Sequence, residues 1–145
     1  MAKPILLIED DRIYRIWVRN ALNELHVENE LVYAADGKEA LEYLCDNTKA
    51  TPCLILLDLY MPKIDGIKFL RVAKSDCVLK HIPVVVLTAS PQAADVAMSF
   101  ELGAAEYLKK GHSYNDLLAK MRRLVPYWAG SQKPTAVAGA TNLNL

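Results

Sequence analysis

The chain has 145 residues, 52% of them hydrophobic and 23% charged, which is the size and composition of one soluble globular domain with a core of its own. Its 17 basic residues balance 17 acidic ones, so no excess of positive charge attracts nucleic acid or an anionic membrane. No apolar run reaches the roughly 18 residues of a membrane span. Three cysteines without metal-ligand spacing, and an N-terminus without a signal-peptide core, predict a reduced, cytoplasmic protein.

The chain contains five short apolar segments. Three of them are apolar throughout, which is typical of strands buried on both faces, and two are shorter or more mixed, which suits edge strands. The first, third and fourth are the fully apolar ones, so they are expected in the middle of a sheet. We predict strands over residues 5–8, 30–34, 53–57, 83–87 and 105–108.

Capping residues and apolar side chains at helical spacing predict a helix after each strand. The five helices are expected to follow Asp11, Asp36-Gly37 and Asp65-Gly66, to run from near Ala93 to Leu102, and to start at Ser113. The last helix is predicted to reach Val125 and to be stopped by Pro126. The apolar face of the first helix is predicted to consist of Ile13, Ile16, Trp17, Ala21, Leu22 and Leu25.

Strands that alternate with helices define an α/β fold with a parallel sheet and right-handed crossovers. Three central apolar strands flanked by two mixed ones fit a doubly wound, flavodoxin-like sheet of order 2-1-3-4-5. Residues 1–126 would form this domain, and residues 127–145 a C-terminal extension. From Gly130 onward the only charged residue is Lys133, so this part is expected to be flexible or to lie in an interface.

Chemistry-bearing residues follow the strands of this predicted sheet. Glu9 and Asp10 come after the first strand, Asp58 ends the third, Thr88 ends the fourth, and Lys110 comes after the fifth. In a doubly wound sheet the ligand site lies beyond the carboxyl ends of the strands. Any one of these residues could be an ordinary loop or capping residue, but the five together predict a single functional crevice.

The charges of that crevice indicate what it binds. Three ionised carboxylates repel each other by about 4 kcal/mol per pair at a spacing of ~4 Å. A divalent cation and one lysine would balance them, and a set of oxygen ligands favours Mg²⁺ or Mn²⁺. Magnesium commonly also binds a phosphate oxygen, and no glycine-rich nucleotide fingerprint is present. Asp58 is therefore the predicted acceptor of a phosphoryl group, held as an acyl phosphate.

Four segments together resemble the receiver domain of two-component response regulators, over residues 3 to about 125. The first is Ile5-Leu6-Leu7-Ile8-Glu9-Asp10-Asp11, and the second is Leu56-Leu57-Asp58-Leu59-Tyr60-Met61-Pro62 followed by Asp65-Gly66. The third is Pro83-Val84-Val85-Val86-Leu87-Thr88-Ala89, and the fourth is Gly103-Ala104-Ala105-Glu106-Tyr107-Leu108-Lys109-Lys110.

This resemblance implies a role for each matching residue. Asp58 would accept the phosphoryl group from a sensor histidine kinase. Asp10 and Asp58 would bind Mg²⁺ directly, together with the backbone carbonyl of Tyr60, and Glu9 would act through a metal-bound water. The protein would be a switch that phosphorylates and dephosphorylates on Asp58, not a turnover enzyme.

The remaining residues of the resemblance concern the phosphorylated state. Lys110 would pair with the phosphoryl oxygens, Thr88 would move to hydrogen-bond them, and Tyr107 would swing inward behind it. The chain departs from the family pattern at its Glu-Asp acidic pair, where Asp-Asp is usual, and at Gly111, where most members have proline. Because a cis bond before a residue other than proline costs ~2.5–4 kcal/mol, we predict a trans bond between Lys110 and Gly111.

Two features suggest a subtype. No second domain follows the receiver segment, so a stand-alone regulator without a DNA-binding output is expected. Residues 79–90 and the pair Tyr127-Trp128 resemble single-domain regulators paired with bacterial phytochrome kinases. Large aromatics beyond the last helix are enriched in interfaces, so we predict a homodimer through the fourth helix, fifth strand and fifth helix, with Tyr127-Trp128 in contact.

Two other functions share parts of this pattern. A magnesium-dependent phosphatase of the haloacid dehalogenase type would also form an aspartyl phosphate, but it places a second Asp two residues after the nucleophile, where this chain has Tyr60. A flavodoxin-like FMN binder needs a hydroxyl-rich loop after the first strand, where this chain has the anionic Asp10-Asp11.

Overall fold

The computed structural model describes residues 2–60, 65–89 and 92–129. The C-terminal residues 130–145, expected to be flexible or in an interface, lie outside the described residues. Within the described ranges no helix has both the length and the apolar character that crossing a bilayer demands.

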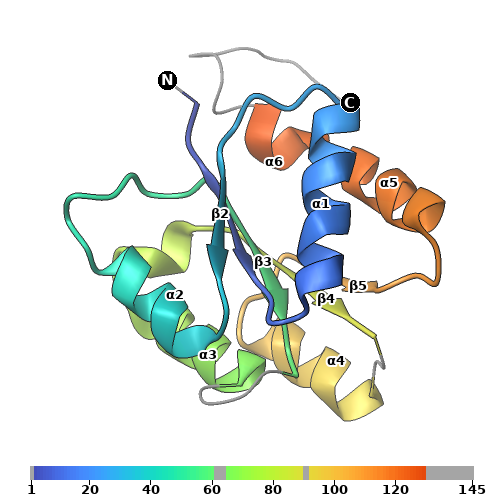
Figure 1. The fold of residues 1–145 in the computed structure, drawn as a ribbon. Coiled ribbons are helices and arrows are strands. Elements are labelled where there is room, and N and C mark those ends of the chain that lie inside the picture. Colours follow the sequence, from blue (N-terminus) through green and yellow to red (C-terminus); the bar gives the residue numbers. More distant parts are fainter. Residues whose placement is uncertain (1, 61–64, 90–91, 130–145) are drawn as a thin grey trace.

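A five-stranded parallel sheet of order β2-β1-β3-β4-β5 forms the centre of the molecule, so the predicted fold class and strand order are confirmed (Figure 1). The strands are β1 (Ile5–Ile8), β2 (Leu31–Ala34), β3 (Leu54–Asp58), β4 (Val84–Thr88) and β5 (Glu106–Lys109). The helices are α1 (Arg12–Glu24), α2 (Gly37–Leu44), α3 (Gly66–Ser75), the 3-10 turn η1 (Leu79–His81), α4 (Ala93–Glu101), α5 (Tyr114–Arg123) and α6 (Val125–Ala129).

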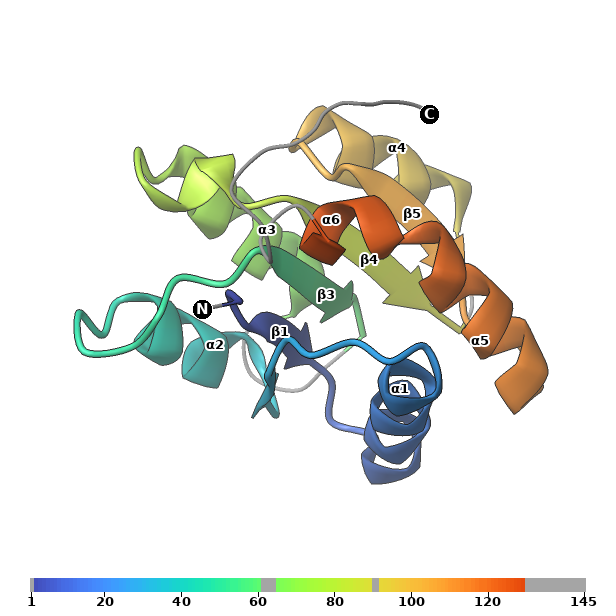
Figure 2. The same cartoon turned by 90° about the horizontal axis from the view of Figure 1, so that it is seen from above.

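Helices cover both faces of the sheet, which is why β1, β3 and β4 are buried throughout (Figure 2). One core cluster packs α2, α3 and η1 against one face, and the other packs α1, α5 and α6 against the opposite face. The register pairs Ile8 with Leu57, Asp58 with Leu87 and Thr88 with Lys109. The carboxyl ends of the four strands β1, β3, β4 and β5 therefore meet at one edge.

The buried face of α1 differs from the prediction. Ile13 and Ile16 are 65% and 49% exposed, and Trp17 is only partly buried. The face that enters the core consists of Tyr14, Val18, Ala21 and Leu22. The predicted stripe is rotated by about one residue from the buried one, because the Tyr14 ring packs inward although its hydroxyl makes the residue look polar.

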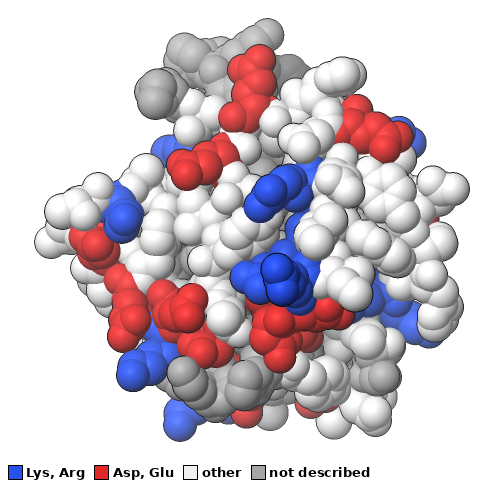
Figure 3. Space-filling model, viewed as in Figure 1, with Lys and Arg blue, Asp and Glu red and all other residues white. Residues whose placement is uncertain are grey.

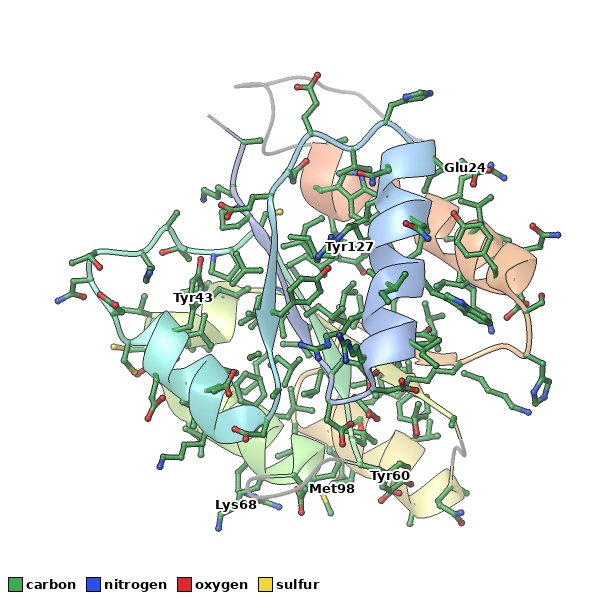
Figure 4. All side chains as sticks on the ribbon, in the orientation of Figure 1. Glu24, Tyr43, Tyr60, Lys68, Met98 and Tyr127 are labelled. Atoms are coloured by element: carbon green, nitrogen blue, oxygen red, sulfur yellow. The ribbon has the colours of Figure 1, made fainter. Side chains whose placement is uncertain are left out.

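The end of the chain also differs from the prediction. Helix α5 ends at Arg123, and Pro126 lies inside α6 and stops nothing. Proline is tolerated in a first helical turn because the amide hydrogens there have no acceptor within the helix. Trp128 is 2% exposed within the core cluster of α1 and α5, so its predicted place in a dimer interface is wrong. Tyr127 is half-buried and donates a hydrogen bond to Glu106 Oε2 at 2.9 Å (Figure 4).

Candidate functional site

The backbone brings the predicted site residues to one edge of the sheet. Glu9 follows β1 directly, Asp58 and Thr88 are the last residues of β3 and β4, and Lys110 follows β5. The amide of Lys110 donates to the Thr88 carbonyl at 2.7 Å, which extends the pairing of β4 and β5 by one residue. The carboxylates and the lysine are thus anchored on rigid strand ends.

Three carboxylates meet at this edge. Glu9, Asp10 and Asp58 each offer an oxygen, and these oxygens all lie within 4.8 Å of one another. Glu9 and Asp58 are buried, with 1% and 6% exposure, whereas Asp10 faces solvent. In Figure 3, acidic side chains gather along the lower rim, near the start of α1, on the side toward which the strand arrows of Figure 1 point.

Lys110 supplies the positive charge of the cluster. Its Nζ lies 2.6 Å from Glu9 Oε1 and 3.6 Å from Asp58 Oδ2, and the side chain is only 12% exposed. The ammonium also sits 4.3 Å from the centroid of the Tyr14 ring, an attractive cation–π arrangement. The Tyr14 ring therefore packs against the ammonium of Lys110.

The site holds more negative charge than its single lysine balances. Burial, and after it the Asp58 carboxylate, raise the pKa of Glu9 to about 7 against the lowering influence of Lys110. Burial also raises the pKa of Asp58, against the influence of Lys110. A pair of oxygens within 4.8 Å repels by at least about 3.5 kcal/mol at an effective dielectric constant of ~20. This oxygen-only, anionic cluster is compatible with a divalent metal ion.

The loop after β3 fixes the position of Asp58. The amide of Tyr60 donates to Asp58 Oδ1 at 3.2 Å, and Asp65 caps α3 through the amide of Lys68 at 2.9 Å. A Cβ on Gly66 would lie 2.7 Å from the carbonyl oxygen of Asp58 and 2.4 Å from Leu59 Cα. Only glycine permits this close approach of α3 to the end of β3.

The two residues expected to act as switches lie behind the carboxylates. Thr88 is fully buried, and its hydroxyl lies beside that of Tyr107, with neither making a well-aligned hydrogen bond to another described residue. The Tyr107 ring is partly buried and lies 6.5 Å from the ring of Phe100, centroid to centroid. Burial raises the pKa of Tyr107, as does Asp95, and Thr88 lowers it.

Contacts around Tyr60 were not anticipated from the sequence. Its side chain is 48% exposed, and its hydroxyl donates to Asp95 Oδ2, on the first turn of α4. Figure 4 places Tyr60 over α4 at the same rim as the acidic cluster. Together with Leu59, Asp65 and Ile67 these two residues line a shallow cavity of about 370 Å³.

Two further groups near the site were missed. Tyr14 was not singled out, although an aromatic four residues after the acidic pair is well placed to reach the adjoining strand end. Asp116 was not singled out either; it lies in the first turn of α5, where its amide donates a hydrogen bond to Ser113 Oγ at 3.2 Å. The carboxylate of Asp116 lies against Gly111, a position already notable for its missing proline.

Comparison with known proteins agrees with this geometry. The family model of the response regulator receiver domain matches residues 5–122. The response regulator Rcp1 of Synechocystis sp. is 37% identical over 130 residues, covering 87% of this chain and 88% of that protein. Among solved structures, the Mn²⁺-bound form of Rcp1 superposes with a TM-score of 0.81 at 36% identity, covering 94% of this chain and 99% of that one.

A second solved structure points the same way. The phosphorylated cyanobacterial phytochrome response regulator RcpA has a TM-score of 0.81 at 34% identity, covering 93% of this chain and 100% of that one. The receiver domain model thus matches most of the chain, and Rcp1 is similar to it over nearly its whole length. This chain belongs to the response regulator receiver domain family, the signalling switches of two-component systems, and is similar to its phytochrome-associated members.

Proposed function

We propose that this protein is a phosphorylation-dependent switch whose Asp58 accepts a phosphoryl group from a sensor histidine kinase. The observation that carries the proposal is the position of Asp58, a buried carboxylate close to the Lys110 ammonium and to the carboxylates of Glu9 and Asp10. An anionic phosphoryl group is stabilised by cations, and this arrangement offers a lysine and the ligands of a metal ion.

The chemical step follows from this arrangement. An Asp58 carboxylate oxygen forms a bond to phosphorus, and the bond from phosphorus to the imidazole nitrogen of the kinase breaks, so the imidazole leaves. Lys110, now 3.6 Å from Asp58, is close enough to pair with a phosphoryl oxygen on the new acyl phosphate. Hydrolysis of the same acyl phosphate returns Asp58 and inorganic phosphate.

Asp10, Asp58 and the carbonyl of Tyr60 would hold Mg²⁺, or Mn²⁺ in its place, with Glu9 acting through a water ligand. The ion would neutralise the phosphoryl oxygens and reduce the repulsion between the carboxylates. Support comes from the donor set, which consists of oxygens alone, and from the raised pKa values of Glu9 and Asp58.

The acyl phosphate would carry about −1.5 to −2 charge in place of the single negative charge of the Asp58 carboxylate, near a buried hydroxyl that lacks a well-aligned partner. Thr88 would turn to that charge, and Tyr107 would move into the space behind it. This movement would alter the surface formed by α4, β5 and α5, where Met98 and Phe100 are exposed. We propose that a second copy of the chain binds this face, without Trp128.

The kinase is proposed to be of the phytochrome type and the protein to act in the cytoplasm. The first idea rests on the similarity to Rcp1 and to the phytochrome response regulator RcpA. A phosphotransfer assay with a phytochrome-type kinase and with an unrelated histidine kinase tests it. Faster phosphoryl transfer from the phytochrome-type kinase is expected, and equal rates from the two kinases would contradict the proposed pairing.

The acceptor function itself is tested with acetyl phosphate, Mg²⁺ and intact-mass measurement. We expect one phosphoryl group per chain, lost again in EDTA only by slow hydrolysis. Steady release of many phosphates per chain would favour the phosphatase alternative, and no mass increase would contradict the proposal. Exposed Glu42→Gln on α2 is the matched control and should label like the native chain.

A further inference from the structure

The turn between β5 and α5 contains an unusual contact. A Cβ built on Gly111 would lie 1.6 Å from Asp116 Oδ2, 2.4 Å from its Cγ and 2.7 Å from its Cβ. No real atom tolerates such distances, so the Asp116 carboxylate occupies the space that a side chain at residue 111 would need. Glycine at this position is required by the packing of a specific carboxylate.

That carboxylate is held in place by a lysine. Lys120 Nζ lies 2.8 Å from Asp116 Oδ2, one helical turn further along α5. The same ammonium also donates a hydrogen bond to the backbone carbonyl of Lys109, the last residue of β5. Lys120 is only 22% exposed, so its charge is partly protected from solvent.

These contacts hold the turn on both sides of Lys110. Lys120 holds the carbonyl of Lys109, Asp116 covers Gly111, and Lys110 lies between them. The Lys110 side chain reaches from this turn to Glu9 at 2.6 Å. No cis peptide bond occurs among the described residues, so the bond between Lys110 and Gly111 is trans, as predicted.

Glycine alone would leave this turn loose. It populates more backbone conformations than any other residue, whereas the proline usual at this position in the family fixes its own φ. A freely moving turn would let the Lys110 ammonium drift from the acyl phosphate. Contacts from α5 to both neighbours of Lys110 remove that freedom.

We propose that Asp116 and Lys120 form a clamp that positions Lys110 for phosphoryl transfer, and that Gly111 is present to make room for it. The proposal rests on the proposed function of Asp58, because Lys110 needs a fixed position only if it binds a phosphoryl group there. Asp116 and Lys120 are positioning residues, which act through Lys110 and touch no reacting atom.

The clamp geometry is tested first, without reference to phosphorylation. Gly111→Ala is expected to lower the thermal midpoint by several degrees, because the new methyl displaces the Asp116 carboxylate. In an Asp116→Ala background the same substitution should cost at most about half as much, since only the Asp116 Cβ then obstructs the methyl. Equal shifts in the two backgrounds would refute the contact.

The positioning role is tested by the rate of phosphorylation from acetyl phosphate. Asp116→Ala and Lys120→Met should each slow the reaction about tenfold, because a catalytic group displaced by even 1 Å loses much of its effect. Mg²⁺ should bind the two variants at least as tightly as the native chain, since Glu9, Asp10 and Asp58 are untouched. In a Lys110→Met background, Asp116→Ala should slow the reaction less than about twofold.

Asn115→Ala is the matched control, because Asn115 lies on the same turn and is exposed. It should phosphorylate at the native rate. Native rates for Asp116→Ala, or an equal slowing with and without Lys110, would overturn the proposal. If the native chain takes up no phosphoryl group, the proposed function fails. The thermal midpoints of Gly111→Ala in the two backgrounds, and the NMR resonance of the Lys110 amide in the Asp116→Ala variant, still decide whether the clamp exists.

Discussion

Replacing Asp58 by asparagine should make the metal-free protein more stable while weakening its response to magnesium. The substitution removes one negative charge from a buried site and preserves the shape of the side chain. The carboxamide oxygen of the asparagine could still accept the hydrogen bond that the Tyr60 amide now donates to Asp58 Oδ1 at 3.2 Å. The change therefore tests the charge of the site rather than its packing.

The magnitude follows from the distances around Asp58. Repulsion from a Glu9 oxygen within 4.8 Å amounts to at least about 3.5 kcal/mol at an effective dielectric constant of ~20. Attraction to Lys110 Nζ at 3.6 Å is about 4.6 kcal/mol on the same scale. The contributions of Glu9 and Lys110 nearly cancel, so desolvation of the buried carboxylate and repulsion from the exposed, solvent-screened Asp10 decide the sign, and about 2 kcal/mol should favour the neutral amide.

The assay is thermal unfolding in EDTA at about pH 8, where Asp and Glu side chains of the unfolded chain are ionised. A gain of about 2 kcal/mol corresponds to a rise of the midpoint by about 4–8 °C for a domain of this size. Saturating Mg²⁺ should raise the midpoint of the native chain and raise that of Asp58→Asn much less. A lower midpoint for Asp58→Asn in EDTA, with native circular dichroism, would refute this account of the site's electrostatics.

Three other outcomes are expected. Burial and the Asp58 carboxylate raise the pKa of Glu9 from 4.5 to about 7, so the folded protein binds that proton more tightly than the unfolded chain. The resulting stabilisation, up to about 3 kcal/mol in EDTA, is complete below pH ~4.5 and is lost as the pH rises through ~7. Glu9→Gln should flatten that part of the stability curve, and an unchanged curve would contradict the assignment. Trp128→Ala should cost about 3–5 kcal/mol in urea unfolding because the ring is buried, and a loss below about 1 kcal/mol would mean that α6 does not pack on the core. Phe100→Ser should weaken the phosphorylated dimer in sedimentation velocity, and a native chain that stays monomeric when phosphorylated would remove the dimer.

The location of the candidate site was predictable because parallel strands end at a common edge. Glu9, Asp58, Thr88 and Lys110 each stand at a strand end, so their assembly required only the strand order and no knowledge of side-chain packing. The strand order in turn followed from which strands are apolar throughout. Residues whose placement depends on the main chain alone were therefore placed correctly.

Residues whose placement depends on side-chain packing were not. Along α1, two apolar stripes offset by one residue compete, and the buried one contains Tyr14, whose ring lies under the ammonium of Lys110. Trp128 was expected at the surface because Pro126 was taken as the end of the fold, although proline fits a first helical turn. The contact of Asp116 with Gly111 joins two elements across a turn, and no periodic pattern in the sequence reports it.

The most direct test of the central claim locates the phosphoryl group by chemistry. The chain is treated with acetyl phosphate and Mg²⁺, the acyl phosphate is reduced with borohydride, and the peptides are sequenced by mass spectrometry. Homoserine at position 58, absent when Mg²⁺ or acetyl phosphate is omitted, is the predicted result. A reduced residue at Glu9 or Asp10, or no reduced residue at all, would contradict the assignment of Asp58 as the acceptor.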